Sequence, residues 1–128
     1  MGRLDPRTVL VVDDDRDIRD SVRDLIEDEG YEVAAVRHGG EAQEWLLKNP
    51  APAVILLDLM MPNMNGWQFL GWLRERDDEL AQVPVVLISG APEHGLDLAR
   101  RSRPLQGCLM KPFDADDLLQ KVGDAMAA

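Results

Sequence analysis

The sequence has few of the residues that disulfide-bonded, membrane-spanning or nucleic-acid-binding proteins require. Its single cysteine can form neither an internal disulfide nor a cysteine-based metal site. No apolar run is long enough to span a bilayer, and no apolar signal region follows the first methionine. Lysine and arginine number 14 against 24 aspartates and glutamates, and the net charge of -10 disfavours direct contact with nucleic acid or anionic membranes. We therefore expect a cytoplasmic protein that binds neither.

The length and the apolar content bound the domain organisation. A chain of 128 residues, of which 45% are hydrophobic, can bury one sizeable core. The acidic residues are spread along the chain, and no repeat, low-complexity tract or linker interrupts it. We expect a single domain over residues 1–128, with the folded core at about 8–126.

Four short apolar runs each end abruptly at a polar residue. These are Val9–Val12 before Asp13–Asp15, Val54–Leu57 before Asp58, Val85–Ile88 before Ser89, and Cys108–Met110 before Lys111. Runs of this kind are typical of buried parallel strands, and open α/β sheets bind ligands at the carboxyl ends of their strands. Acids, a hydroxyl and a lysine gathered at that edge suit a divalent metal and a phosphoryl group.

Helical patterns alternate with five candidate strands along the chain. The strands are expected at residues 8–12, 32–36, 53–57, 85–88 and 107–110. Five helices are expected: from about Asp17 to Gly30, over 39–48, from 65 onward, between 92 and 104, and after an N-cap at Asp114. Pro92, Gly95 and Pro104 crowd the limits of the fourth of these helices.

This alternation predicts the fold class. Strands that alternate with helices indicate a parallel sheet covered by helices on both faces. Five strands suit the order 2-1-3-4-5 of the flavodoxin-like α/β fold, a (βα)5 three-layer sandwich. In that order the first and third strands are neighbours, so we expect Asp13, Asp14 and Asp58 to converge from distant parts of the sequence.

Converging carboxylates indicate a cation site. Carboxylates this close repel one another, and burial strengthens the repulsion, which protonation, a bound cation or a lysine can relieve. Mg²⁺ suits two or three carboxylate or carbonyl oxygens together with water and phosphate oxygens, and Mn²⁺ is an alternative ion. An aspartate beside such a metal can attack a phosphoryl donor and become an aspartyl phosphate. The metal and Lys111 would stabilise the charge on the transferring group, and Ser89 could hydrogen-bond it.

The segments around these residues resemble the receiver domain of two-component response regulators, a family that includes chemotaxis regulators. The matching segments are VLVVDDD at 9–15, LLDLMMPNMNG at 56–66, VLISGA at 86–91 and LMKPF at 109–113. They occur in the family's order and at its spacing, and the resemblance covers essentially the whole chain.

The resemblance implies a role for each candidate residue. Asp58 would be the phosphoacceptor, and Lys111 and Ser89 would act on the phosphoryl group. The metal ligands would be the carboxylates of Asp13, Asp14 and Asp58 and the backbone carbonyl of Met60. Beyond its own phosphorylation and dephosphorylation at Asp58, such a protein catalyses nothing. The resemblance also implies a cis Lys111–Pro112 bond.

The resemblance implies protein partners as well. The phosphoryl donor would be a phosphohistidine on a sensor histidine kinase or a histidine phosphotransfer protein, and a downstream protein would read the phosphorylated state. The protein would be a monomer or a weak dimer. We expect no output domain after the last helix. A stand-alone receiver and a fragment of a larger regulator or hybrid kinase both stay open, as do the pathway and the target.

The sequence departs from the family at two places near the candidate site. Ser89 and Cys108 hold the switch positions, but receivers commonly carry Tyr or Phe where Cys108 stands. That ring moves inward when the hydroxyl turns toward the phosphoryl group, and a cysteine is too small to fill the same volume. Met60 and Ala91 hold positions that control access of water to the phosphoryl group, and neither can orient a water. We therefore expect slow self-dephosphorylation.

Two other functions stay open at this point. A haloacid-dehalogenase-type phosphatase also begins with a strand that ends in Asp-x-Asp, which Asp13 and Asp15 match. That family uses a later acidic pair after a strand, which is missing here, and it has no counterpart of the segment from Asp58 to Gly66. The other alternative is a degenerate receiver that serves only as a protein-binding scaffold. Cys108 favours this scaffold, and the complete set of acidic, hydroxyl and lysine residues argues against it.

Overall fold

The computed structural model describes residues 5–61, 64–90 and 107–127. Its strands are β1 (Asp5–Val12), β2 (Glu32–Val36), β3 (Pro52–Asp58), β4 (Val85–Ser89) and β5 (Gly107–Met110). Its helices are α1 (Arg16–Asp28), α2 (Gly39–Lys48), α3 (Gly66–Arg74), α5 (Ala115–Ala127) and the short 3-10 helix η1 (Glu79–Gln82). The helix expected between residues 92 and 104 lies outside the described residues.

The five strands form one parallel sheet in the order β2-β1-β3-β4-β5, which confirms the expected topology. The register pairs Val12 of β1 with Leu57 of β3, so the residues that follow them, Asp13 and Asp58, come out at the same edge. On the other side, Ser89 of β4 pairs with Met110 of β5, directly before Lys111. The topology therefore places all four polar strand ends along one edge of the sheet.

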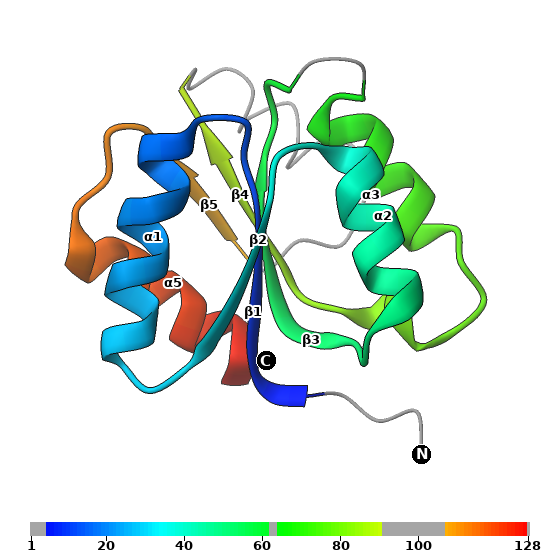
Figure 1. The fold of residues 1–128 in the computed structure, drawn as a ribbon, viewed down its shortest axis with the longest axis horizontal. Helices are drawn as coiled ribbons and strands as arrows, with labels where there is room; N and C mark the ends of the chain where they lie inside the picture. The colour runs from blue at the N-terminus through cyan, green and yellow to red at the C-terminus, as the bar shows by residue number, and fades with distance from the viewer. Residues whose placement is uncertain (1–4, 62–63, 91–106, 128) are drawn as a thin grey trace.

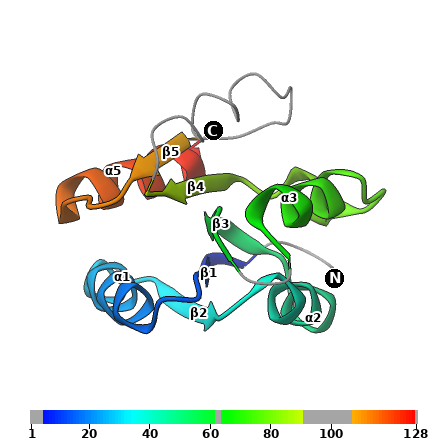
Figure 2. The same cartoon turned by 90° about the horizontal axis from the view of Figure 1, so that it is seen from above.

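Helices cover both faces of the sheet, α1 and α5 on one face and α2 and α3 on the other (Figure 1; Figure 2). Alternate strand residues face opposite layers, as the pleat requires. Val9 and Val11 pack in the α1–α5 layer, whereas Leu10 and Val12 pack in the α2–α3 layer. Burying each such side chain stabilises the fold by roughly 1.5–3 kcal/mol. Because both faces are covered, the strands read as continuous apolar runs rather than as alternating ones.

Local signals define the helix ends. Asp15 caps α1 by accepting hydrogen bonds from the N–H groups of Asp17 and Ile18, and Gly30 follows its end with a φ of 93°. Asp114 accepts a hydrogen bond from the N–H of Asp117 at 2.8 Å, as expected at the start of α5. The largest difference from the expected strand bounds is at β1, which begins at Asp5 rather than at residue 8 and whose register shifts before Val9. Among the described helices, none is long and apolar enough to cross a membrane.

Candidate functional site

Three carboxylates meet at the carboxyl edge of the sheet. Asp13 and Asp14 follow β1 directly, and Asp58 is the last residue of β3. Their ligand oxygens all lie within 4.8 Å of one another. Asp13 is wholly buried and Asp58 is 2% exposed, whereas Asp14 is exposed. The structure thus brings together the acidic residues that the strand order predicts to be neighbours.

The environment of Asp58 makes its carboxyl a weaker acid than an ordinary aspartate. Burial, and next the negative charge of Asp13, raise the pKa of Asp58 from 3.8 to about 7. The positive charge of Lys111 and the N–H of Met60, which lies 3.3 Å from Asp58 Oδ1, act in the opposite direction. The carboxyl group of Asp58 is therefore close to half-protonated near neutral pH.

Lys111 reaches into the carboxylate cluster from β5. Its Nζ lies 3.1 Å from Asp13 Oδ2 and 3.6 Å from Asp58 Oδ1. Burial lowers the pKa of the Lys111 ammonium, but the charges of Asp13 and Asp58 outweigh burial and hold the pKa above its usual value. The Lys111 N–H donates to the carbonyl of Ser89 at 2.7 Å, and the Lys111–Pro112 peptide is cis, as expected. Lys111 is therefore a fixed positive charge beside both buried acids.

One buried oxygen of the cluster has no hydrogen bond among the described residues. Asp13 Oδ1 accepts from the N–H of Asp15 at 2.9 Å, but Asp13 Oδ2 accepts none. Lys111 Nζ lies 3.1 Å from Oδ2 as an ion-pair partner, outside hydrogen-bond geometry. Buried polar atoms are rarely left in this state, and three adjacent carboxylates repel one another. An oxygen-binding divalent cation such as Mg²⁺ fits this set of ligands.

The loop after Asp58 closes back onto its own first residues. The N–H of Gly66 donates to the carbonyl of Leu59 at 2.9 Å. A Cβ added at Gly66 would lie 2.7 Å from the carbonyl oxygen of Asp58 and 2.8 Å from the Cα of Leu59. Only glycine fits there, a constraint that the Asn65–Gly66 helix start did not reveal. The side chain of Met60, in the same loop, is 61% exposed.

The two residues expected at the switch positions lie on the neighbouring strands β4 and β5. Ser89 is wholly buried at the end of β4, and Cys108 is half-buried in β5 opposite Leu87. Cys108 packs against the core layer under α2 and α3. Burial raises the pKa of its thiol, although the charge of Lys121 acts the other way. Cys108 is thus a packing residue and not a reactive thiolate.

Sequence reasoning missed Arg19, a residue of α1 that contacts the acidic turn. Its Nη1 donates to the backbone carbonyl of Asp13 at 2.9 Å. The position lies only six residues further along the chain, but nothing in the pattern indicates that this arginine turns back toward the strand end. The other arginines of α1, Arg16 and Arg23, offer the same sequence signal.

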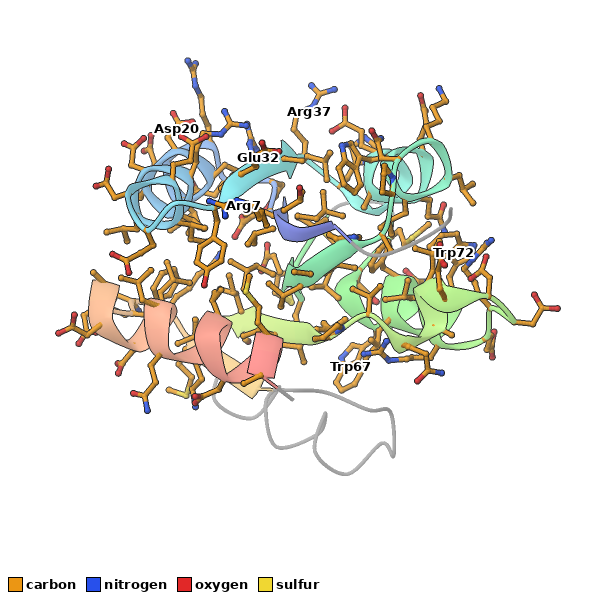
Figure 3. The ribbon with its side chains drawn as sticks, turned by 90° about the horizontal axis from the view of Figure 1, so that it is seen from below. Arg7, Asp20, Glu32, Arg37, Trp67 and Trp72 are labelled. Atoms are coloured by element: carbon orange, nitrogen blue, oxygen red, sulfur yellow. The ribbon has the colours of Figure 1, made fainter. Side chains whose placement is uncertain are left out.

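A cavity of about 520 Å³ lies along the outer edge of β2. It is lined by charged residues of both signs and by Trp45 of α2. Arg37 projects outward from the end of β2 (Figure 3) and pairs with Glu41 at 2.7 Å, and Lys48 pairs with Glu44 at 2.9 Å. Arg37 and Lys48 thus have acidic partners, and the third lining cation, Arg19, donates to the carbonyl of Asp13.

Comparison with known proteins finds one family that matches almost the whole chain. The family described as the response regulator receiver domain matches residues 9–123. The chain is similar to the polar-differentiation response regulator DivK of Brucella anthropi, with 31% identity over 94% of this chain and 99% of DivK. It is also similar to the response regulator Rre1 of Synechocystis sp., with 34% identity over 96% of this chain and 53% of Rre1.

Longer proteins and solved structures match in the same way. The sensor histidine kinase TmoS of Ectopseudomonas mendocina is 32% identical over 96% of this chain, which spans only 12% of TmoS. Among solved structures, the chemotaxis response regulator CheY4 of Vibrio cholerae superposes with a TM-score of 0.82 and 28% identity. That match covers 92% of this chain and 97% of CheY4. The chain thus spans a small part of one relative, about half of another and nearly all of a third.

Proposed function

Because the chain belongs to the response regulator receiver domain family of two-component signalling, we propose that it is a phosphoacceptor whose Asp58 takes a phosphoryl group from a phosphohistidine. The donor would be a sensor histidine kinase or a histidine phosphotransfer protein. The observation that carries the proposal is the position of Asp58. It is buried at the end of β3, with Lys111 Nζ 3.6 Å away and two further carboxylates within 4.8 Å.

A divalent cation, Mg²⁺ or Mn²⁺, completes the proposed site. Asp13, Asp14 and Asp58 would hold it together with the backbone carbonyl of Met60, and the cluster's uncompensated charge supports this assignment. When bound, the ion neutralises negative charge on the three carboxylates and on the transferring phosphoryl group. The raised pKa of Asp58 in the metal-free protein means that a cation would also favour its ionised, nucleophilic form.

The protein's own residues would carry the transfer. A carboxylate oxygen of Asp58 attacks phosphorus, the phosphorus–nitrogen bond of the phosphohistidine breaks, and the imidazole leaves and takes up a proton. Lys111 stabilises charge on the transferring group, because its Nζ already lies between Asp13 and Asp58. The buried hydroxyl of Ser89, at the adjacent strand end, hydrogen-bonds the attached phosphoryl group.

The readout would be a change in protein contacts. We propose that the phosphorylated form binds a downstream protein, and that the protein acts as a monomer or weak dimer. With Cys108 at the position usually held by an aromatic ring, movement of Ser89 would be transmitted by smaller shifts in β4 and β5. No aromatic side chain would swing inward at this position.

Phosphoramidate, a small donor with the same phosphorus–nitrogen bond, tests the reaction class. We expect Mg²⁺-dependent phosphate release that Asp58→Asn abolishes, since release must pass through the aspartyl phosphate. If Asp58→Asn releases phosphate at the wild-type rate while Asp13→Asn does not, the protein is a phosphatase with Asp13 as its nucleophile. If the wild type neither releases phosphate nor gains a phosphoryl adduct with either ion, the scaffold interpretation holds.

A further inference from the structure

We propose that Arg19 is a positioning residue of the cation site, which holds Asp14 in place by fixing the backbone on both sides of it. The inference rests on the proposed function, because it assumes that the carboxylate cluster binds a divalent cation. Arg19 touches none of the carboxylates that would bind the ion. Its effect would pass through the main chain of the acidic turn.

Arg19 makes two hydrogen bonds to this turn, one on each side of Asp14. Its Nη1 donates to the carbonyl of Asp13 at 2.9 Å, and its backbone N–H donates to the carbonyl of Asp15 at 3.0 Å. The carbonyl of Asp13 belongs to the peptide plane that leads into Asp14. When the hydrogen bond from Arg19 holds this peptide plane, the orientation of Asp14 depends only on its own φ and ψ angles. Because Asp15 is anchored on the other side, these two angles are restricted as well.

The residues beside Asp14 are anchored independently. The N–H of Asp13 donates to the carbonyl of Val36 at 3.2 Å, and the side chain of Asp13 accepts from the N–H of Asp15. Asp15 in turn caps α1. The turn is thus fixed to β2 at one end and to α1 at the other. The side chain of Arg19 adds a second connection from α1, to the carbonyl of Asp13 at the start of the turn.

Asp14 itself has no such anchor. Its side chain is exposed, and among the described residues none donates a hydrogen bond to its carboxylate. Its oxygen nevertheless lies within 4.8 Å of the ligand oxygens of Asp13 and Asp58. The negative charge of Asp13, and that of Asp58 when it is ionised, would turn an unrestrained Asp14 away into solvent. The backbone direction that Arg19 helps to set therefore keeps it in the cluster.

A purely electrostatic role for Arg19 predicts the opposite effect on cation binding. If Arg19 served only as a positive charge near the cluster, its removal would make the site more negative and would strengthen binding of Mg²⁺. If Arg19 positions Asp14, its removal releases a ligand and weakens binding. The sign of the change in Mg²⁺ affinity therefore separates the two roles.

Arg16 provides the matched control. It lies on the same helix, closer in sequence to the acidic turn, and its side chain is 84% exposed. Its ion-pair contact is Asp20 at 3.8 Å and not the turn. Arg16→Gln and Arg19→Gln remove the same charge from neighbouring positions, but only Arg19→Gln removes the bond to Asp13.

The experiment is isothermal titration of Mg²⁺ into the wild type, Arg19→Gln and Arg16→Gln. We expect Arg19→Gln to weaken Mg²⁺ binding about tenfold, the low end for residues that orient metal ligands. We expect Arg16→Gln to leave it unchanged or slightly tighter. In the metal-free proteins, the NMR amide signals of Asp14 should move in Arg19→Gln and stay in place in Arg16→Gln.

Other results would overturn the inference. Unchanged or tighter binding by Arg19→Gln refutes positioning, and an equal loss in Arg16→Gln shows that the bond to Asp13 is not the cause. Urea unfolding without metal checks that each variant is folded. If Arg19→Gln does not fold, Arg19→Lys replaces it, and the same tenfold loss is expected because the shorter side chain cannot reach the carbonyl of Asp13. If the wild type itself binds no Mg²⁺, the proposed function fails and not the role of Arg19 alone.

Discussion

Lys111 Nζ lies 3.1 Å from Asp13 Oδ2, although Lys111 follows the edge strand β5 and Asp13 follows β1, with β3 and β4 between them in the sheet. The lysine side chain therefore extends across the ends of two strands and passes Asp58 on the way, 3.6 Å from its Oδ1. In the metal-free protein it is the counter-ion of the two buried acids. It also stands where charge on a phosphoryl group attached to Asp58 would develop.

Removing this lysine should slow phosphorylation, whereas the same substitution at a lysine outside the site should have little effect on the rate. We expect Lys111→Met to lower the rate of phosphorylation by acetyl phosphate about a hundredfold, as for the loss of one charge-stabilising donor. Lys48→Met is the control, because Lys48 is 70% exposed and pairs only with Glu44. Rates of adduct formation by mass spectrometry measure both. A Lys111→Met rate equal to that of the control would remove Lys111 from the mechanism.

The raised pKa of Asp58 predicts how stability depends on pH. The folded protein holds a proton on Asp58 up to about pH 7, whereas an unfolded aspartate loses it near 3.8. The native state therefore binds more protons in that interval, and the contribution of Asp58 to the free energy of unfolding falls as pH rises from about 4 to 7. Asp58→Asn cannot ionise and should lack this contribution.

The measurement is urea unfolding of metal-free wild type and Asp58→Asn at pH 5 and pH 8. Relative to the wild type, we expect the free energy of unfolding of Asp58→Asn to be higher at pH 8 than at pH 5 by about 1–3 kcal/mol. Each unit of pKa difference corresponds to about 1.4 kcal/mol. Mg²⁺ should reduce this relative increase in the free energy of unfolding, because it stabilises the ionised wild type at pH 8. A difference between the two proteins that is the same at both pH values would show that the pKa of Asp58 is ordinary.

Gly66 should tolerate no side chain. We expect Gly66→Ala to lower the free energy of unfolding by about 1–3 kcal/mol, because its Cβ would lie 2.7 Å from the backbone oxygen of Asp58. Gly71, in the middle of α3, is the control: a Cβ there meets nothing within 4 Å. Gly71→Ala should stabilise the protein by up to about 1 kcal/mol through helix propensity. If both substitutions stabilise, the loop after Asp58 closes less tightly than described.

The aspartyl phosphate should be long-lived. The Met60 side chain beside Asp58 is 61% exposed and cannot orient a water molecule for attack on phosphorus. We expect the isolated phosphoprotein to lose its phosphate over many minutes, and Met60→Asn, whose amide can hold a water, to lose it several-fold faster. Release of phosphate after removal of the donor measures both lifetimes. A wild-type lifetime of seconds would contradict this expectation.

The positions of the strands and helices could be predicted from the sequence because the relevant signals are local, whereas the strand order rested partly on the family resemblance. Apolar runs such as Val9–Val12 end at charged residues, and helix ends carry their own marks in Asp15, Gly30 and Asp114. Alternation of these elements restricts a five-stranded parallel sheet to few topologies. The convergence of Asp13 with Asp58 then follows from neighbouring strands with aligned ends.

The parts that escaped prediction depend on three-dimensional contacts. The role of Arg19 arises because its long side chain turns back to one carbonyl, and no periodicity encodes that choice among the arginines of α1. The demand for glycine at residue 66 comes from the backbone of Asp58, eight residues earlier. The irregular register at the start of β1 is set by pairing with Pro52 and not by the local pattern.

The central claim is that Asp58 is a cation-dependent phosphoacceptor. Intact-mass analysis after incubation with acetyl phosphate, with and without Mg²⁺, tests it on the wild type and Asp58→Asn. The account predicts one phosphoryl adduct on the wild type that requires Mg²⁺ and is absent from Asp58→Asn. An adduct of equal yield on Asp58→Asn, or none on the wild type under any condition, would contradict it.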